Sequence, residues 1–473
     1  MTSITVGLFG IGLDTYWQQF EGLLARLQKY QYTVARKIEA KGAKMIDAGI
    51  VDNPQRANEV SQLFQQSKVD IIFLNISTYA LSHNVLPVVQ KVKVPVVVLN
   101  LQPERAIDYE RFNRISDRGK MTGEWLAYCQ SCVAPELASV FNRANIPFQL
   151  ISGYLEDPYV WSQAEGFLKA AYIRKSMAHN RVGLLGHYYN GMLDVYSDLT
   201  QQAAVFGNHF ELLEMGTLKM LREAVSEQEI NEKIQDFEQT FAVSPECESH
   251  QLQRAAKTAV ALEKLVTHYQ LGSLAYYYEA TGDKSYLDIV TSLIPGLTLL
   301  TGRNVPVAGE YEVKNVQAMK ILDLLGCGGS FSEFYALDFD DDVILLGHDG
   351  PAHFDIAQGK VGLVPLPVYH GKPGSGLSIQ MKVRSGPVTL LSVCQNAQGK
   401  VFLLIAEGMS EDGPTLQIGN TNSRYRFGVS VRTFIDQWSK AGPSHHCAIG
   451  VGHQADVLHK LGWLLGIGCV QIC

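Results

Sequence analysis

The segments Asp70-Ile-Ile-Phe-Leu-Asn75 and Val94-Pro-Val-Val-Val-Leu-Asn100 decide the fold class. Each is a short, continuous apolar run, which is typical of a strand buried on both faces of a parallel sheet. Ile4-Thr-Val-Gly-Leu-Phe-Gly10 predicts a further strand, and helical patterns at 54–66 and 85–91 lie between the runs. Short β-branched strands that alternate with helices predict an α/β layer fold.

The rest of the chain changes in character twice. The segment His179-Asn-Arg-Val-Gly-Leu-Leu-Gly186 predicts the first strand of a second αβ unit, residues 218–264 are mostly helical by period, and 273–278 resembles a strand. From about Gly326, Gly, Pro and Asp turns separate short strand patterns, which indicates an antiparallel sheet or barrel. These patterns span residues 343–346, 363–366, 377–383, 388–393, 401–407 and 424–429.

The sequence therefore predicts an α/β protein with three domains, which fits a length of 473 residues at about 150 residues per domain. Residues 1–170 and 171–326 are expected to form two Rossmann-like αβα domains with parallel sheets. Residues 327–473 are expected to form a mainly antiparallel, barrel-like domain.

Composition excludes several classes of function. The chain has 40 basic and 47 acidic residues and a formal net charge of −7, whereas a nucleic-acid binder carries a basic stripe. The most apolar segments extend over about ten residues, whereas a membrane span needs about 20. The first residues lack the pattern of a signal peptide, and eight cysteines are too few for a disulfide scaffold. We expect a cytoplasmic protein with neither a nucleic-acid nor a membrane partner.

Three motifs have ordinary structural explanations. Gly7-Leu-Phe-Gly-Ile-Gly12 has the spacing G-x-x-G-x-G rather than the dinucleotide fingerprint G-x-G-x-x-G, which favours a tight strand-to-helix turn. Cys129 and Cys132 lack the partners of a zinc ribbon, so ordinary buried thiols are the favoured interpretation. Asp338-Phe-Asp-Asp-Asp342 lies between two strand patterns and predicts a solvated hairpin loop.

The strongest constellation lies in the last third of the chain. Glu310 stands at the start of a helical pattern, Glu333 follows a glycine-rich segment, and His348 ends a strand pattern. His445 and His446 are expected in a turn. Carboxylates and imidazoles beside glycine, in breaks between elements, suit a divalent metal that accepts nitrogen and oxygen ligands. Because the separations of 23, 15 and 98 residues between Glu310, Glu333, His348 and His446 match no local metal motif, the residues alone indicate only a candidate carboxylate–histidine site.

These segments resemble the L-arabinose isomerase family, within the wider L-arabinose/L-fucose isomerase superfamily. Ala308-Gly-Glu-Tyr-Glu-Val-Lys314 is similar to the family's A-G-E-G-D-W-K motif, and Ser330-Phe-Ser-Glu333 is similar to its S-F-M-E-D-Y segment. Leu346-Gly-His348 and the tandem His445-His446 follow in the same order and at comparable spacing. On these four motifs the chain is identified as a divergent member of the family.

The resemblance implies that Glu310, Glu333, His348 and His446 bind a catalytic Mn²⁺-type cation, with Co²⁺ or Mg²⁺ as alternatives. The family converts an aldose into its ketose through a cis-enediol. Glu310 and Glu333 would be the catalytic acid/base pair, and the cation would stabilise charge on the two reacting oxygens. His445 would form a hydrogen bond with a sugar hydroxyl.

The resemblance also implies substrate contacts beyond the metal ligands. Tyr79 matches an aromatic position of the family's H-T-F loop, Met192 matches a methionine after its F-G-D-N stretch, and Tyr278 matches the Phe of its F-E-D-L segment. In the family, the first domain of a neighbouring subunit completes the site within a hexamer, so we expect a homo-oligomer. The charged fraction of 18%, below the usual value of about 25%, agrees with large buried interfaces.

The departures from the family lie in the segments that contact the sugar. Gly10-Ile-Gly-Leu-Asp-Thr-Tyr16 replaces G-S-Q-x-L-Y-G, Ser77-Thr-Tyr79 replaces H-T-F, and Gly186-His-Tyr-Tyr-Asn190 replaces the F-G-D-N region. We therefore expect a metal-dependent isomerase of a free pentose or hexose, with the substrate shifted from L-arabinose. The alternatives are another enediol-type sugar enzyme (a fucose-type isomerase, an epimerase or an aldolase) and a non-catalytic sugar-binding relative.

Overall fold

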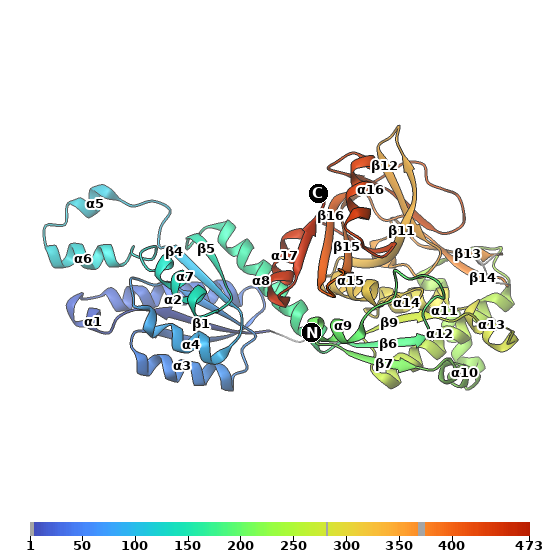
Figure 1. Cartoon of the computed structure of the whole chain (residues 1–473), viewed down its shortest axis with the longest axis horizontal. Helices are drawn as coiled ribbons and strands as arrows, with labels where there is room; N and C mark the ends of the chain where they lie inside the picture. The colour runs from blue at the N-terminus through green and yellow to red at the C-terminus, as the bar shows by residue number, and fades with distance from the viewer. Residues whose placement is uncertain (1–3, 281, 368–373) are drawn as a thin grey trace. The chain divides into compact units, whose positions relative to one another are not determined.

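A computed structural model describes residues 4–280, 282–367 and 374–473. The chain divides into two compact units, Met1–Lys175 and Ser176–Cys473, and the boundary falls in the last turn of helix α8 (Pro158–Ala178). Figure 1 draws both units and labels many of their helices and strands. The further division of the second unit at residue 326 stays a prediction.

The first unit is a parallel sheet of five strands in the order β2-β1-β3-β4-β5, with helices packed against it (Figure 1). The central strands β1, β3 and β4 are buried along almost their whole length, as their apolar runs predict. The strands are β1 (Thr5–Ile11), β2 (Lys44–Val51), β3 (Ile71–Asn75), β4 (Val96–Gln102) and β5 (Phe148–Tyr154). The helices before α8 are α1 (Thr15–Gln19), α2 (Leu23–Glu39), α3 (Pro54–Gln66), α4 (Leu86–Val92), α5 (Tyr109–Asn113), α6 (Arg118–Leu126) and α7 (Ala134–Arg143), with a 3₁₀ turn, η1 (Ser82–Asn84).

The second unit begins with a smaller parallel sheet in the order β10-β9-β6-β7. Its strands are β6 (Arg181–Gly186), β7 (His209–Leu213), β9 (Ser273–Tyr277) and β10 (Val307–Ala308). The accompanying helices are α9 (Leu199–Phe206), α10 (Met215–Glu223), α11 (Glu227–Thr240), α12 (Ser249–Tyr269), α13 (Lys284–Val290), α14 (Ile294–Gly302) and α15 (Val313–Leu324). The expectation that 218–264 is mostly helical is confirmed.

The remainder of the second unit forms a closed antiparallel barrel, which confirms the predicted fold class. Six strands close in the order β15-β18-β11-β12-β17-β16, because β16 also pairs with β15. They are β11 (Gly328–Asp338), β12 (Val343–His348), β15 (Gly386–Gln395), β16 (Val401–Glu411), β17 (Thr421–Phe427) and β18 (His446–Val451). The elements around the barrel are β19 (Gly468–Gln471), α16 (Val431–Lys440), α17 (Ala455–Leu465), a 3₁₀ turn η2 (Phe354–Ile356), and a small sheet of β8 (Ala242–Val243), β13 (Gly362–Leu366) and β14 (Gly376–Gln380).

Helix α15 is the element that links the smaller sheet to the barrel. Every residue from Val313 to Leu322 is buried, and the helix packs against β9 and β10 as well as β11, β15 and β18. Gly329 on β11 makes this packing close, because a Cβ at this position would lie 2.4 Å from the carbonyl oxygen of Met319. Its φ of +109° is also a backbone conformation that residues other than glycine rarely adopt.

Two details of the expected site environment are corrected by these elements. Glu333 lies within strand β11 rather than in a break between elements, and His446 is the first residue of β18 rather than part of a turn. The predicted hairpin loop is confirmed, since residues 339–342 connect β11 directly to β12. Cys129 is buried as expected, whereas Cys132 is exposed, and both are free thiols.

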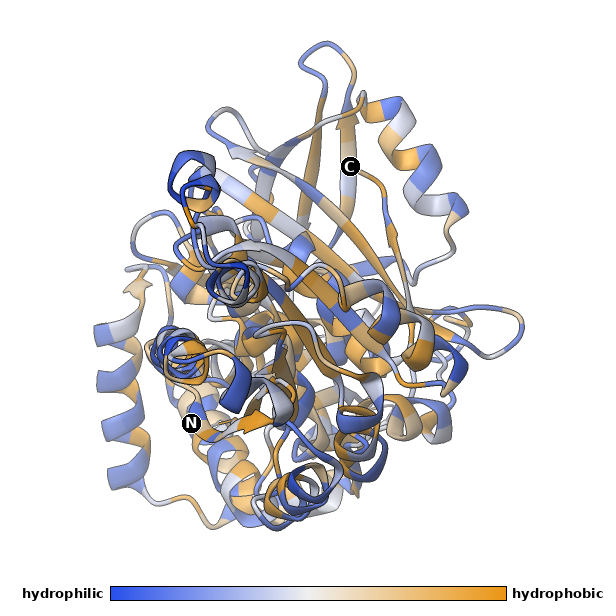
Figure 2. Ribbon diagram, turned by 90° about the vertical axis from the view of Figure 1, so that its left-hand side faces the viewer, coloured by the Kyte–Doolittle hydropathy of each residue, from blue (hydrophilic) through white to orange (hydrophobic). Residues whose placement is uncertain are grey.

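Hydrophobic residues gather on the strands and inner helices, while the outer helices carry hydrophilic residues along one side (Figure 2). This is the pattern expected for layers that bury one face of each helix. Across residues 4–280, 282–367 and 374–473, every helix falls short of the combined length and hydrophobicity that a membrane span needs.

Candidate functional site

The register of the barrel strands brings three of the four predicted metal ligands together. Glu333 on β11 pairs with His446 on β18 and, on its other side, with Gly347 on β12, which precedes His348. Strands pair about 5 Å apart, so residues that are distant in sequence become neighbours through two ladders. Phe331, two residues before Glu333, packs against the His348 and His446 rings at centroid distances of 4.5 and 4.3 Å.

The fourth residue, Glu310, reaches the site from a tight turn before α15. Glu310 and Tyr311 have φ values of +55° and +60°, so two consecutive non-glycine residues adopt the left-handed conformation. Such residues cost about 1–3 kcal/mol each and are common at functional sites. The turn is held by a hydrogen bond from Tyr311 N to Tyr276 O and another from Glu312 N to Gly309 O, both 3.0 Å long.

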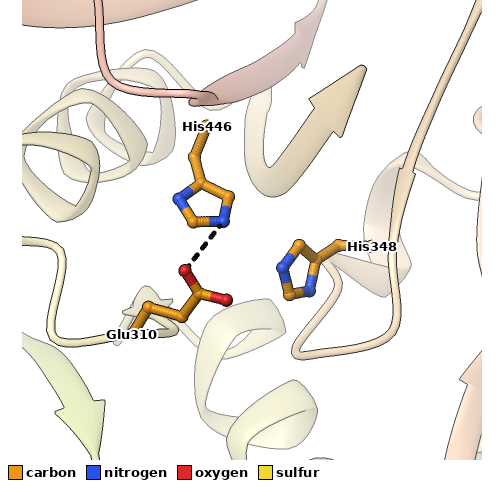
Figure 3. Close-up of side chains that lie close together, drawn as sticks. All are labelled: Glu310, His348 and His446. Carbon is orange, nitrogen blue, oxygen red and sulfur yellow. Dashed lines mark ion pairs between the residues drawn. The ribbon is translucent and has the colours of Figure 1, made fainter. Parts of the chain in front are cut away.

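The side chains converge in two overlapping groups. Glu310, His348 and His446 each offer one ligand atom, and these atoms lie within 4.8 Å of one another. Glu333, His445 and His446 form a second group that meets the same limit. Figure 3 shows the first group, in which the Glu310 carboxylate points to the His446 ring and His348 lies beside both. His446 is common to both groups and is completely buried.

Two atoms in this cluster are buried and unsatisfied. Glu310 Oε2 and His446 Nε2 lie 3.4 Å apart, yet within the described part of the chain neither atom has a hydrogen-bond partner. Buried polar atoms without partners are rare, and each calls for an explanation such as an ion. Carboxylate oxygen and imidazole nitrogen are also the ligand atoms that first-row divalent cations bind. The residues therefore fit a metal ion between Glu310, His348 and His446, with Glu333 adjacent.

Glu312 fixes the orientation of His446. The His446 Nδ1 hydrogen is donated to Glu312 Oε2 over 2.5 Å, and both side chains are almost completely buried. Because the Glu312 carboxylate accepts a hydrogen bond from Nδ1, the ring hydrogen of His446 lies on Nδ1. The lone pair of Nε2 is then free to face Glu310. Metal-bound histidines are commonly oriented by a carboxylate in this way.

The environment of Glu333 favours a raised pKa. Burial raises the pKa of its carboxyl above the ordinary value, and the nearby His446 and His445 rings partly offset this effect. A carboxyl group with a raised pKa is closer to the operating range of a general acid or base.

His445 is held between two carboxylates on the other side of the cluster. Its Nδ1 lies 2.6 Å from Asp194 Oδ2, and its Nε2 lies 3.5 Å from Glu310 Oε2. The Glu310 contact is the largest cause of a pKa raised to about 9, and together with Asp194 it outweighs the opposing effect of burial. His445 is therefore suited to be a charged hydrogen-bond donor beside the cluster.

A cavity of about 300 Å³ opens beside Glu333 and His445. This volume lies at the lower end of the range of small-molecule sites. Besides these two residues, the cavity is lined by Asp194, Phe334, Trp438, Ser439, Pro443 and Ser444.

The other residues expected from sequence lie apart from this cluster in the chain. Met192 is half-buried in the loop that also carries Asp194, and Tyr278 packs between the His187 and Tyr286 rings at 5.4 and 5.2 Å. Tyr79 belongs to the first unit, where it packs, as Tyr16 and Trp17 do, against a small buried cluster that includes Leu27 and Leu126.

Three residues at the site had no role assigned from sequence: Glu312, Asp194 and Tyr277. Burial raises the pKa of the Tyr277 hydroxyl, and the negative charge of the nearby Glu310 raises this pKa further. Glu312 lies within the motif Ala308–Lys314, and the spacing Glu310-x-Glu312 is the signal that marks it in the sequence. Asp194 is separated from His445 by 251 residues, and no local pattern marks it.

The chain was compared with known proteins. No protein-family model matches it. It is 22% identical over 353 residues to an L-arabinose isomerase of Nocardioides sp. (strain ATCC BAA-499 / JS614), covering 71% of this chain and 68% of that protein. It is 22% identical over 377 residues to L-arabinose isomerase 1 of Bacillus licheniformis, covering 77% and 74%. An L-arabinose isomerase of Klebsiella pneumoniae (strain 342) is 20% identical over 351 residues, with coverage of 70% and 68%. The chain is therefore similar to L-arabinose isomerases over about 70% of its length, at about 20% identity, as a divergent relative of them would be.

Proposed function

We propose that this chain is a metal-dependent aldose–ketose isomerase that acts on a free pentose or hexose. The observation that carries the proposal is the pair of buried, unsatisfied atoms Glu310 Oε2 and His446 Nε2, which converge with His348. An unsatisfied buried polar group costs about 1–3 kcal/mol, so these atoms are best explained as metal ligands. Similarity to L-arabinose isomerases supports the reaction class.

The proposed ligands are Glu310, Glu333, His348 and His446. Two imidazoles disfavour calcium, while two carboxylates suit manganese. We therefore propose Mn²⁺, with Co²⁺ and Mg²⁺ as alternatives. When bound, the cation would stabilise the negative charge that develops on the two reacting sugar oxygens.

The two glutamates would carry the protons. Isomerisation removes a proton from C2 of the aldose and returns one to C1, while another proton moves between O1 and O2. Glu310 and Glu333 would lie on opposite sides of the cis-enediol and serve these transfers as general acid and base. The raised pKa of Glu333 supports its part in this exchange.

The remaining predicted contacts would recognise the sugar. His445 would donate a hydrogen bond to a hydroxyl, and Met192 and Tyr278 would contact the carbon chain. Tyr79 would act from the first unit of a neighbouring subunit, since we propose a homo-oligomer, a hexamer by analogy with the family. The altered segments Gly10–Tyr16 and Ser77–Tyr79 support a substrate other than L-arabinose.

Product analysis tests this proposal directly. The protein is incubated with Mn²⁺ and single pentoses, hexoses and deoxy sugars, and the products are identified by ¹³C NMR. We expect the ketose of one aldose as the product, and none with Glu333→Gln under the same conditions. A C2 epimer or a pair of cleavage products would contradict isomerisation and would indicate an epimerase or an aldolase. A sugar that binds without conversion would indicate a non-catalytic relative.

A further inference from the structure

We propose that Asp194 is the positioning residue of His445 and holds its Nε2 atom toward the substrate. This inference rests on the proposed function, and it adds a residue from the loop between β6 and α9 to the site. Asp194 lies 251 residues from His445 in sequence, so the contact exists only in the folded second unit.

The contact uses one carboxylate oxygen and two hydrogen bonds. Asp194 Oδ2 accepts from the His445 backbone N at 3.0 Å and from the His445 ring Nδ1 at 2.6 Å. Because both the backbone N and the ring Nδ1 of His445 bind the same oxygen of Asp194, the imidazole ring is held in one orientation relative to its own backbone. Because the acceptor is a carboxylate, Nδ1 donates its hydrogen to Asp194, and Nε2 is the nitrogen that faces the site.

Nε2 of His445 lies beside the proposed catalytic residue Glu310, where it could donate a hydrogen bond to an oxygen of the sugar. Nε2 lies 3.5 Å from Glu310 Oε2, and the His445 ring packs against the His446 ring with centroids 3.8 Å apart. His445 and Glu333 both line the 300 Å³ cavity, and Asp194 lines it as well. An aspartate also orients a histidine in the Ser-His-Asp triad, where loss of the carboxylate greatly reduces turnover.

The backbone of Asp194 provides a separate anchor for the loop. Its carbonyl oxygen accepts hydrogen bonds from Lys314 Nζ at 2.5 Å and from Ser444 Oγ at 3.1 Å. These bonds do not depend on the carboxylate, so a side-chain substitution removes the contact with His445 and keeps the loop attached. The Asp194 side chain is 39% exposed, and ion pairs at this exposure contribute little to stability. If Asp194 had only a structural role, its substitution should therefore leave both stability and kcat/KM almost unchanged.

The test uses the full-length protein with the variants Asp194→Ala, Asp194→Glu and His445→Ala. We expect Asp194→Ala to lower kcat/KM by about 10-fold to 100-fold, as removal of an orienting partner does, with Mn²⁺ affinity within about twofold. Asp194→Glu should restore part of the loss. The double variant Asp194→Ala/His445→Ala should be no worse than His445→Ala alone, since both changes affect one unit. Glu248→Gln is the matched control, because Glu248 pairs with a histidine, His250, at 3.0 Å outside this site.

A second readout does not require activity. The Nδ1 proton of His445, in a hydrogen bond of 2.6 Å, should give a low-field ¹H–¹⁵N signal that is lost in Asp194→Ala. If no aldose is converted by the wild-type protein, the isomerase proposal fails, and this signal still decides the role of Asp194. A signal unchanged in Asp194→Ala would overturn the positioning role. Additive losses in the double variant, or kcat/KM within twofold of wild type in Asp194→Ala, would overturn it as well.

Discussion

Glu312 accepts a 2.5 Å hydrogen bond from Nδ1 of His446, and neither side chain is more than 1% exposed. This buried pair determines which nitrogen of His446 faces Glu310. The two glutamates of the segment Glu310-Tyr-Glu312 therefore have different functions in our account: the first is a ligand and the second orients a ligand.

Replacement of Glu312 by Gln tests this division. Gln keeps the size and one acceptor oxygen but removes the charge, so we expect Mn²⁺ affinity to fall by about 10-fold to 100-fold while the fold is retained. Isothermal titration of the metal-stripped protein measures the effect. Glu411→Gln is the control, since Glu411 pairs with Arg426 on the barrel surface. An affinity for Glu312→Gln within twofold of wild type would show that the pair is only structural.

Glu333→Gln separates catalysis from folding. The substitution removes a proton carrier and a charged ligand, so kcat should fall by at least about 1000-fold, while the melting temperature stays close to that of wild type. Steady-state kinetics with saturating Mn²⁺ measure the first quantity, and calorimetry measures the second. Turnover near the wild-type rate would assign Glu333 a structural role.

His445→Ala separates substrate binding from metal binding. Because His445 contributes no ligand in the proposed set, we expect KM to rise by roughly 10-fold, the loss of one hydrogen bond to a charged group, while bound Mn²⁺ stays at the wild-type level. Metal content after dialysis and KM are measured on the same sample. Loss of the metal in this variant would mean that the roles of His445 and His446 are exchanged.

A cluster of charges outside the site predicts a pH-dependent stability. Burial alone would raise the pKa of Asp236, but hydrogen bonds from Arg303 and Lys233 outweigh it and lower this pKa to about 2. A carboxyl group with a depressed folded-state pKa stabilises the folded state above its unfolded value of 3.8, and the contribution is lost as the pH falls through 2.

Asp236→Asn should therefore destabilise the protein by about 1 kcal/mol at pH 7, after allowance for solvent screening, and by progressively less between pH 4 and pH 2. Urea unfolding of both proteins across this range measures the difference. A difference that stays constant between pH 7 and pH 3 would exclude an ionic contribution of Asp236.

The central strands of the first sheet could be predicted from sequence, whereas its edges could not. β3 is buried on both faces, so it appears as an uninterrupted apolar run. β2 and β5 lie at the two edges of the sheet and expose several residues each, which removes that signal. β11 was missed for another reason: Gly328 and Gly329, with φ values above +100°, suggest a loop, but here they allow the strand to pack closely on α15.

The candidate site could be predicted only as a set of residues. Their convergence depends on strand register, because Glu333 pairs with His446 on one side and with Gly347 on the other. Register between strands that are distant in sequence produces no short motif by which the pairing could be recognised. The roles of Glu312 and Asp194 depend on contacts with His446 and His445, which lie 134 and 251 residues away in the chain. The catalytic and ligand roles of the predicted residues stay predictions.

Metal dependence of ketose formation is the decisive property of the proposed isomerase. Ketose formation is measured with chelator-stripped protein before and after addition of Mn²⁺, across pentoses, hexoses and deoxy sugars, alongside Mn²⁺ binding to the same samples. We expect one bound Mn²⁺ per chain, no ketose from the stripped protein, and recovery of ketose formation on addition of the metal. Ketose formed at the full rate by the stripped protein would contradict this proposal, and so would wild-type Mn²⁺ affinity in a Glu310→Gln/His446→Gln variant.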